Sequence, residues 1–238
     1  MRRQARAQLT FDDIQPPLRW GGRRKGAGRP ESKRARVRHR RRCEHSAPSP
    51  AHVTLRMQRG VPSLRTRRFV HEFRRTLGGA CERGEFRVLH YSLQRDHVHL
   101  IVEAESRRAL TRGMKSIGAR LARAVNRIFQ RTGTVLDGRY HLHLLRTPRE
   151  VRAALAYVLL NARKHWHQRF GCLPPVRLDD ASSARWFDGW NADRGSSEAH
   201  QPFDPPEIAR ARTWLARVGW RRHGLIDPSE VPGHAERT

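Results

Sequence analysis

The chain has 238 residues, which is enough for one sizeable core with extensions, and its apolar content of 37% is low for a fully globular chain. The net charge of +27 comes mainly from arginine and predicts an acidic partner, nucleic acid before membrane, because no apolar run approaches the roughly 20 residues of a transmembrane helix. Three scattered cysteines (Cys43, Cys81 and Cys172) argue against a disulfide framework or a zinc ribbon, and the N-terminus lacks the apolar stretch of a secretory signal, so we expect a cytoplasmic protein.

Residues 1–48 form a basic segment, with fifteen Lys and Arg against four Asp and Glu and almost no apolar periodicity. This composition predicts a largely disordered DNA-binding arm. Within it, the glycine-rich stretch 21–30 resembles an AT-hook, a narrow segment that lies in the minor groove of DNA. A solvated linker held to phosphate by charge alone is the alternative. The candidate DNA contacts of the arm are Arg23, Arg24, Lys25 and Arg29.

Residues 49–104 differ from the basic segment in having regularly spaced apolar residues. Alternation over 52–57 predicts a strand, and apolar spacing over 64–81 predicts a helix that ends at a Gly-Gly pair. Residues 86–93 alternate again, and only three residues, 94–96, separate them from the apolar run that starts at His97. A separation of that length predicts a β-hairpin.

The next elements are a long amphipathic helix and a short strand. Apolar residues at steps of three and four predict a helix ending with Ile128, before Gly133, and residues 139–145 predict a fourth strand. A helix then starts at Pro148 and runs to about His167. The order β-α-β-β-α-β predicts an α+β, ferredoxin-like sandwich, with an antiparallel sheet and helices on one face, followed by one additional C-terminal helix.

We therefore expect three regions: the arm over 1–48, the α+β domain over 49–168, and a Trp- and Pro-rich extension over 169–238. In the extension, a short helix is predicted from Pro206 to about Arg217, and its four tryptophans are expected to pack rather than to stack on bases. The sequence assigns the extension no role.

The long helix carries basic side chains on its remaining faces. They form either a solvated face or the wall of a groove for a phosphate backbone. The candidate DNA contacts there are Arg112, Lys115, Arg120, Arg123 and Arg127.

Two histidines lie one residue apart at the start of the strand that follows the hairpin turn. His97 and His99 would project side by side from one face, where two neutral imidazoles form half of a divalent-metal site. The alternative is an ordinary strand with two half-exposed histidines. Tyr157 and Asn161 are neighbours on one helical face, so a phenol and an amide oxygen are expected to face the same region. A cation there would polarise a phosphodiester and favour attack by a hydroxyl.

The stretch from about residue 52 to 165 resembles the HUH single-tyrosine transposases, in particular the IS200-like and REP-associated tyrosine transposases. The resemblance rests on His52-Val53-Thr54, on Asp96-His97-Val98-His99-Leu100-Ile101, on Gly138-Arg139-Tyr140-His141 and on Tyr157-Val158-Leu159-Leu160-Asn161. It implies that His97 and His99 bind Mg²⁺ or Mn²⁺ with Asn161 as a third ligand. It also implies that Tyr157 attacks single-stranded DNA, forms a 5′-phosphotyrosine and transfers the strand without a nucleotide cofactor, on hairpin or palindromic repeat ends.

Two residues depart from the family pattern, which puts the efficiency of the reaction in doubt. Asp96 stands where relatives usually have Asn, and Ala162 stands where many have Pro. Other hypotheses stay open. The histidine-x-threonine of His52 and Thr54 also occurs in two-histidine RNA phosphoesterases, although the second motif here lacks the hydroxyl. A domesticated, catalytically silent DNA-binding protein is the non-enzymatic alternative.

Three further properties concern assembly and location. The second histidine pair, His141 and His143, is expected to be solvated or to contact phosphate, and Tyr140 is the next candidate nucleophile after Tyr157. The resemblance is compatible with a monomer and with a homodimer that exchanges its tyrosine helices. The basic charge predicts association with the nucleoid in the cytoplasm and no membrane partner.

Overall fold

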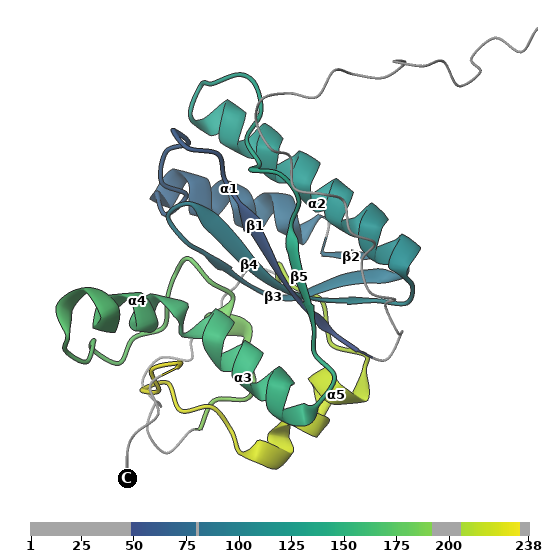
Figure 1. The fold of residues 1–238 in the computed structure, drawn as a ribbon, viewed down its shortest axis with the longest axis vertical. Coiled ribbons are helices and arrows are strands. Elements are labelled where there is room, and N and C mark those ends of the chain that lie inside the picture. The colour runs from purple at the N-terminus through teal and green to yellow at the C-terminus, as the bar shows by residue number, and fades with distance from the viewer. Residues whose placement is uncertain (1–48, 80, 192–205, 234–238) are drawn as a thin grey trace, which may run out of the picture. The chain divides into compact units, whose positions relative to one another are not determined.

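The computed structural model describes residues 49–79, 81–191 and 206–233. Its centre is an antiparallel five-stranded sheet in the order β2-β3-β4-β1-β5 (Figure 1). The strands are β1 (Ala51–Arg56), β2 (Glu82–Arg83), β3 (Phe86–Leu93), β4 (His97–Ala104) and β5 (His141–Leu144). Apart from the two-residue β2, this strand order and the helices between the strands confirm the predicted ferredoxin-like fold.

Helices cover both faces of the sheet, rather than one face as predicted (Figure 1). Two of them, α1 (Arg67–Gly78) and α2 (Arg107–Ile128), pack on one face, and α3 (Pro148–Leu159) packs on the other. Alternation along the strands divides the core in the same way. In β4, Leu100 belongs to the cluster under α1 and α2, whereas Ile101 belongs to the cluster under α3.

Side-chain caps set where the helices begin. The helix predicted over 64–81 is shorter, because the hydroxyl of Thr66 accepts a hydrogen bond from the Phe69 amide and fixes the start of α1 at Arg67. Ser106 caps α2 and Thr147 caps α3 in the same manner. The hairpin between β3 and β4 has the three-residue connection that was predicted.

The helix predicted to run unbroken from Pro148 to about His167 is wrong. It breaks at Leu160, and a second helix, α4, spans Asn161–Phe170. The residues from Val158 to Asn161 are all buried. A straight helix lying on a sheet buries one side only, so the break allows consecutive side chains at this point to be covered.

The predicted helix from Pro206 to Arg217 is also largely wrong. Helix α5 contains only Trp214–Arg217 and is followed by the 3-10 helix η4, Gly219–His223. The backbone amides of Arg212 and Thr213 donate instead to the buried carboxylate of Glu103 in β4. A tertiary hydrogen bond thus takes the amides that a longer helix would have needed.

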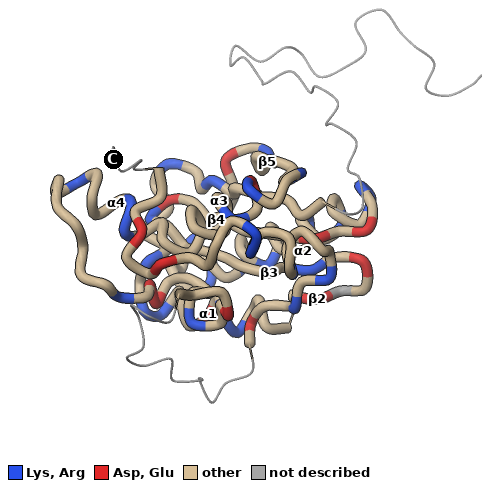
Figure 2. The backbone as a smooth tube through the Cα atoms, turned by 90° about the horizontal axis from the view of Figure 1, so that it is seen from below, with Lys and Arg blue, Asp and Glu red and all other residues tan. Residues whose placement is uncertain are grey.

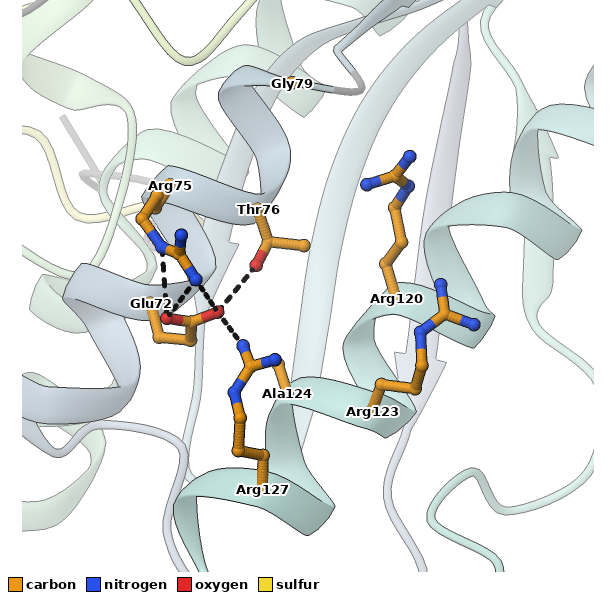
Figure 3. A pocket seen from close by; sticks show the side chains of 8 residues that line it. All are labelled: Glu72, Arg75, Thr76, Gly79, Arg120, Arg123, Ala124 and Arg127. Atoms are coloured by element: carbon orange, nitrogen blue, oxygen red, sulfur yellow. Dashed lines mark hydrogen bonds and ion pairs between the residues drawn. The ribbon is translucent and has the colours of Figure 1, made fainter.

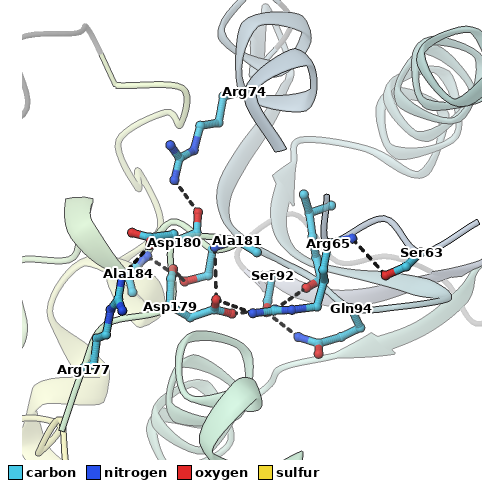
Figure 4. Close-up of polar contacts among 12 residues, drawn as sticks. Ser63, Arg65, Arg74, Ser92, Gln94, Arg177, Asp179, Asp180, Ala181 and Ala184 are labelled. Atoms are coloured by element: carbon cyan, nitrogen blue, oxygen red, sulfur yellow. Dashed lines mark hydrogen bonds and ion pairs between the residues drawn. The ribbon is translucent and has the colours of Figure 1, made fainter. Parts of the chain in front are cut away.

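The C-terminal segment (residues 171–191 and 206–233) reaches both faces of the sheet, with Ala181 in the cluster under α1 and α2 and its last part against α3. Trp220 and Ile226 are fully buried in the cluster under α3, so Trp220 packs as predicted. Alongside β3, the Leu93 amide donates to the Ala181 carbonyl at 2.8 Å. Figure 4 shows Arg65 reaching this segment, where its guanidinium binds both carboxylate oxygens of Asp179 at 2.9 and 2.7 Å.

The predicted basic arm, with Arg23, Arg24, Lys25 and Arg29, lies outside the described residues. Within the described ranges, no helix combines the length and hydrophobicity that crossing a membrane requires.

Candidate active site

Two adjacent strands bring the histidines of the sequence motif, in β4, together with His52 and Thr54 of β1. In the antiparallel pair of β1 and β4, Thr54 lies opposite His99 and Arg56 lies opposite His97. Directly paired residues share a face of the sheet, here the α3 face. The Nε2 atoms of His97 and His99 lie 3.0 Å apart, so the two rings converge on one point, as their spacing predicted.

The other ring nitrogen of each histidine has its own partner. His97 Nδ1 lies 2.8 Å from Oδ1 of Asp96. His99 Nδ1 lies 3.1 Å from Thr54 Oγ1 and 3.1 Å from His52 Nε2. The sequence motifs marked His52 and Thr54 as part of the family resemblance and of another enzyme's motif, but not as neighbours of His99. Their contact with His99 follows from strand register, which the sequence pattern does not give.

Burial keeps the inner imidazoles neutral. It lowers the pKa of His99 to about 3, helped by the nearby His52 and His97. It also lowers the pKa of His52 to about 4, helped by His143 and His141. A neutral imidazole keeps a lone pair, which is the form that binds a metal ion.

Tyr157 lies beside these histidines. It is half-buried in the last turn of α3, and its ring centroid is 5.2 Å from that of His99 and 5.7 Å from that of His52, both in edge-on orientations. From α4, Lys164 places its Nζ 4.6 Å from the centre of the tyrosine ring, and His165 lies 6.4 Å from His97, ring to ring. One chain therefore assembles the phenol and the paired imidazoles on one face of the sheet.

The other tyrosines do not share this position. Tyr91 is fully buried in the cluster under α1 and α2, where its hydroxyl donates to Glu207 at 2.6 Å. Tyr140, the second-choice nucleophile, packs against that same cluster. Tyr157 is the tyrosine whose ring lies against the rings of His52 and His99.

Asn161 is the first residue of α4 and is completely buried. Neither its amide oxygen nor its amide nitrogen has a hydrogen-bond partner among the described residues. Leaving a buried amide unsatisfied costs about 1–3 kcal/mol. An amide oxygen in that state is a suitable ligand for a hard cation.

The donors present fit a divalent cation. Adjacent ligands around an octahedral Mg²⁺, at bond lengths near 2.1 Å, lie about 3 Å apart. The 3.0 Å between the two Nε2 atoms matches this spacing. Among the described residues, no group of three or more His, Cys, Asp or Glu is arranged to hold a metal. Asn161 has an amide oxygen without a hydrogen-bond partner, which is the donor type that Mg²⁺ accepts beside imidazoles.

The second histidine pair lies on the neighbouring edge strand. In β5, His141 pairs with Thr54 and His143 pairs with His52, and both side chains are exposed. They therefore extend the histidine face of the sheet outward from the proposed metal site. Their exposure agrees with the predicted solvated or phosphate-contacting role.

The basic residues of α2 lie on the opposite side of the sheet. Arg120 and Arg123 line a hollow of about 260 Å³ between α1 and α2, where Arg75 and Arg127 both bind Glu72 (Figure 3). Arg112 pairs with Glu85 at 3.4 Å, and Lys115 is exposed. Lys and Arg also occur on most other elements (Figure 2). The structure thus does not bring the α2 candidates together with the histidines.

Comparisons with known proteins give a family match. Residues 50–148 match the family described as transposase IS200 like. The match ends before Tyr157 and Asn161. A search of curated proteins finds no match.

Solved structures give two similar chains. One is described as the structure of the REP-associated tyrosine transposase bound to a REP hairpin, with 15% identity, a TM-score of 0.45, and coverage of 54% of this chain and 74% of the other. The second is a provisionally assigned transposase from Deinococcus radiodurans, with 13% identity, a TM-score of 0.34, and coverage of 48% and 84%. The match over residues 50–148 is to the same family that the sequence motifs resemble, which confirms that resemblance and supports a transposition-related function.

Proposed function

We propose that the protein is a metal-dependent transposase that nicks single-stranded DNA and transfers the strand through a covalent 5′-phosphotyrosine on Tyr157. The observation that carries the proposal is the contact of Tyr157 with His99, at 5.2 Å between ring centroids, next to the paired Nε2 atoms. The family match over 50–148 supports the same class of reaction.

The proposed covalent step exchanges one phosphate ester for another. The phenolic oxygen of Tyr157 bonds to phosphorus, the bond from phosphorus to the 3′ oxygen breaks, the phenolic proton leaves, and the released 3′ oxygen takes up a proton. Attack by another 3′-hydroxyl reverses these bond changes and rejoins strands. The phosphotyrosine ester retains the free energy that rejoining the strands requires, so no nucleotide cofactor is needed.

His97, His99 and Asn161 would hold Mg²⁺ or Mn²⁺. When bound, this cation polarises the phosphodiester and stabilises the charge that develops on its oxygens. Lys164, beside the tyrosine ring, adds positive charge where the negative phosphodiester would lie. The groups come from a single chain, so the proposal does not require two subunits to exchange helices.

The proposed substrate is DNA with hairpin or palindromic ends, and the proposed location is the bacterial cytoplasm in association with the nucleoid. The net charge of +27 supports binding to a polyanion. In this proposal, the arm over 1–48 and the α2 arginines contact phosphate away from the histidines, while residues 49–168 carry out the chemistry.

A covalent-adduct assay tests the proposal. Labelled single-stranded hairpin DNA is incubated with the full chain and Mn²⁺ and then denatured in SDS. We expect an SDS-resistant adduct that is lost in Tyr157→Phe and falls at least 100-fold in the His97→Ala/His99→Ala double variant. Tyr140→Phe is the matched control and should retain the adduct.

Two results would contradict the proposal. An adduct that persists in Tyr157→Phe would place the nucleophile elsewhere. DNA binding without any adduct in the unaltered protein would instead favour the catalytically silent DNA-binding protein.

A further inference from the structure

We propose that Asp96 and Thr54 are positioning residues that fix which nitrogen of His97 and His99 carries the proton, so that both Nε2 lone pairs face one divalent cation. This inference rests on the proposed metal-dependent function and adds the residues that orient its metal ligands. Neither residue touches the reacting atoms.

The contact on the outer side is a carboxylate–histidine pair. Asp96 Oδ1 lies 2.8 Å from His97 Nδ1, and the Asp96 side chain is 65% exposed. A carboxylate only accepts hydrogen bonds when it is ionised, so the proton of a neutral His97 must sit on Nδ1. The lone pair of His97 is then on Nε2, the atom that faces His99.

The contacts on the inner side give His99 the same arrangement. Its Nδ1 lies 3.1 Å from both Thr54 Oγ1 and His52 Nε2. In the proposed arrangement, His99 Nδ1–H donates to both atoms, since a hydroxyl oxygen and the unprotonated nitrogen of the neutral His52 ring can each accept. Thr54 therefore accepts a hydrogen bond from His99 Nδ1 across the strand pair, just as Asp96 accepts one from Nδ1 of His97. In both rings the lone pair is then left on Nε2.

The result is a pair of facing lone pairs. With both Nδ1 atoms protonated, the two Nε2 atoms, 3.0 Å apart, have no hydrogen to share between them. Two acceptor lone pairs at that distance repel each other unless a positive charge lies nearby. The two lone pairs are therefore preorganised to bind a cation. Metal-binding histidines commonly donate their second N–H to a carboxylate or another acceptor in this way.

The two supports differ in charge. An Asn at position 96 would keep an acceptor oxygen but lack the negative charge. A carboxylate raises the basicity of the imidazole it accepts from, whereas a hydroxyl mainly orients it. Asp96→Asn therefore separates orientation from charge, and Asp96→Ala removes both.

Mn²⁺ binding tests the inference without relying on turnover. The full chain and its variants are titrated with MnCl₂ and free Mn²⁺ is followed by electron paramagnetic resonance. Removing an outer partner of a metal ligand commonly weakens binding 10–100-fold, and we expect losses in that range for Asp96→Ala and Thr54→Val. Asp96→Asn should lose less than Asp96→Ala. Asp137→Ala, which removes another exposed carboxylate, is the matched control and should bind as the unaltered protein does.

The ring tautomers provide a second readout. Nitrogen-15 NMR of the metal-free protein should show His97 and His99 protonated at Nδ1, with the His97 signal moving toward a mixture of tautomers in Asp96→Ala. Unchanged Mn²⁺ affinity in Asp96→Ala and Thr54→Val, with adduct formation intact, would overturn this inference and leave the proposed function standing. Absence of Mn²⁺ binding in the unaltered protein would overturn both.

Discussion

The two faces of the central sheet carry opposite kinds of residue, although the same strands build both. Toward α1 and α2, β4 presents Val98, Leu100 and Val102, all fully buried in an apolar cluster. Toward α3, the same strand presents His99 and Glu103 on either side of Ile101. Along β4, one face therefore contributes apolar burial, while the other holds buried polar groups that each need a partner.

The polar groups on the α3 face find hydrogen-bond partners at both ends of β4. At one end, the histidines bind one another, Thr54 and Asp96. At the other end, Glu103 accepts from residues 212 and 213 of the C-terminal segment. The segment that the sequence left without a role thus completes the polar face, and its removal would expose groups that α3 alone does not cover.

The largest expected effect comes from removing the Glu103 carboxylate. It lies within 3.3 Å of Arg87 Nε, and both side chains are almost fully buried, at 1% and 4% exposure. Glu103→Ala leaves a buried guanidinium without this partner and should lower the free energy of unfolding by about 3–5 kcal/mol in urea denaturation.

Glu105→Ala is the control for that variant. Glu105 also lies near Arg87, at 3.5 Å, but is 53% exposed, so its loss should cost less than about 1 kcal/mol. Glu103 also accepts from the amides of Arg212 and Thr213. If both substitutions lowered the free energy of unfolding equally, the buried Glu103 carboxylate would not stabilise the fold more than an exposed one does.

A smaller effect should appear as pH dependence on the α3 face. Burial lowers the pKa of His90 to about 4, and its Nδ1 lies 3.2 Å from Ser183 Oγ in the C-terminal segment. An unfolded histidine titrates near pH 6.5, so the unfolded chain binds the extra proton between pH 6.5 and 4, and acidification through this range destabilises the folded state.

Urea denaturation at several pH values checks this prediction. We expect His90→Gln to reduce the loss of stability by at most roughly 1 kcal/mol per pH unit in that window, because this proton-linked difference disappears. His71→Gln, on an exposed part of α1, is the matched control. If the free energy of unfolding changed with pH in His90→Gln as it does in the unaltered protein, burial of the His90 ring beside Ser183 would not be the cause of the pH dependence.

The smallest effect on stability is expected on the outside of the α1 and α2 layer. Arg120→Ala/Arg123→Ala should change the free energy of unfolding by no more than about 0.5 kcal/mol, since the guanidiniums line a hollow rather than a core. If they contact DNA phosphates, the slope of log affinity against log salt concentration should fall by about 2.

Arg107→Ala/Arg108→Ala, on exposed positions of the same helix, serves as the comparison. If the Arg120→Ala/Arg123→Ala variant bound DNA with the affinity and salt dependence of the unaltered protein, the hollow would not be part of the DNA-contacting surface. Equal losses in both pairs would indicate a diffuse charge effect rather than a specific contact.

The sequence by itself determined the four long strands of the sheet, the two helices between them and their order. Alternation with a period of two placed His97 and His99 on one face of a strand, and helical spacing identified the long helix between β4 and β5. These patterns are local, because they repeat within a few residues. That is why the ferredoxin-like order and the family resemblance could be predicted before any contact was known.

Only the tertiary structure decided the partners of these residues. The contact of His52 with His99 joins residues 47 apart, and that of Glu103 with Thr213 joins residues 110 apart. Strand register and docking of the C-terminal segment set such contacts, and neither has a local sequence signal. The break at Leu160, which fixes where Tyr157 and Asn161 lie, likewise depends on which side chains the surrounding core can bury.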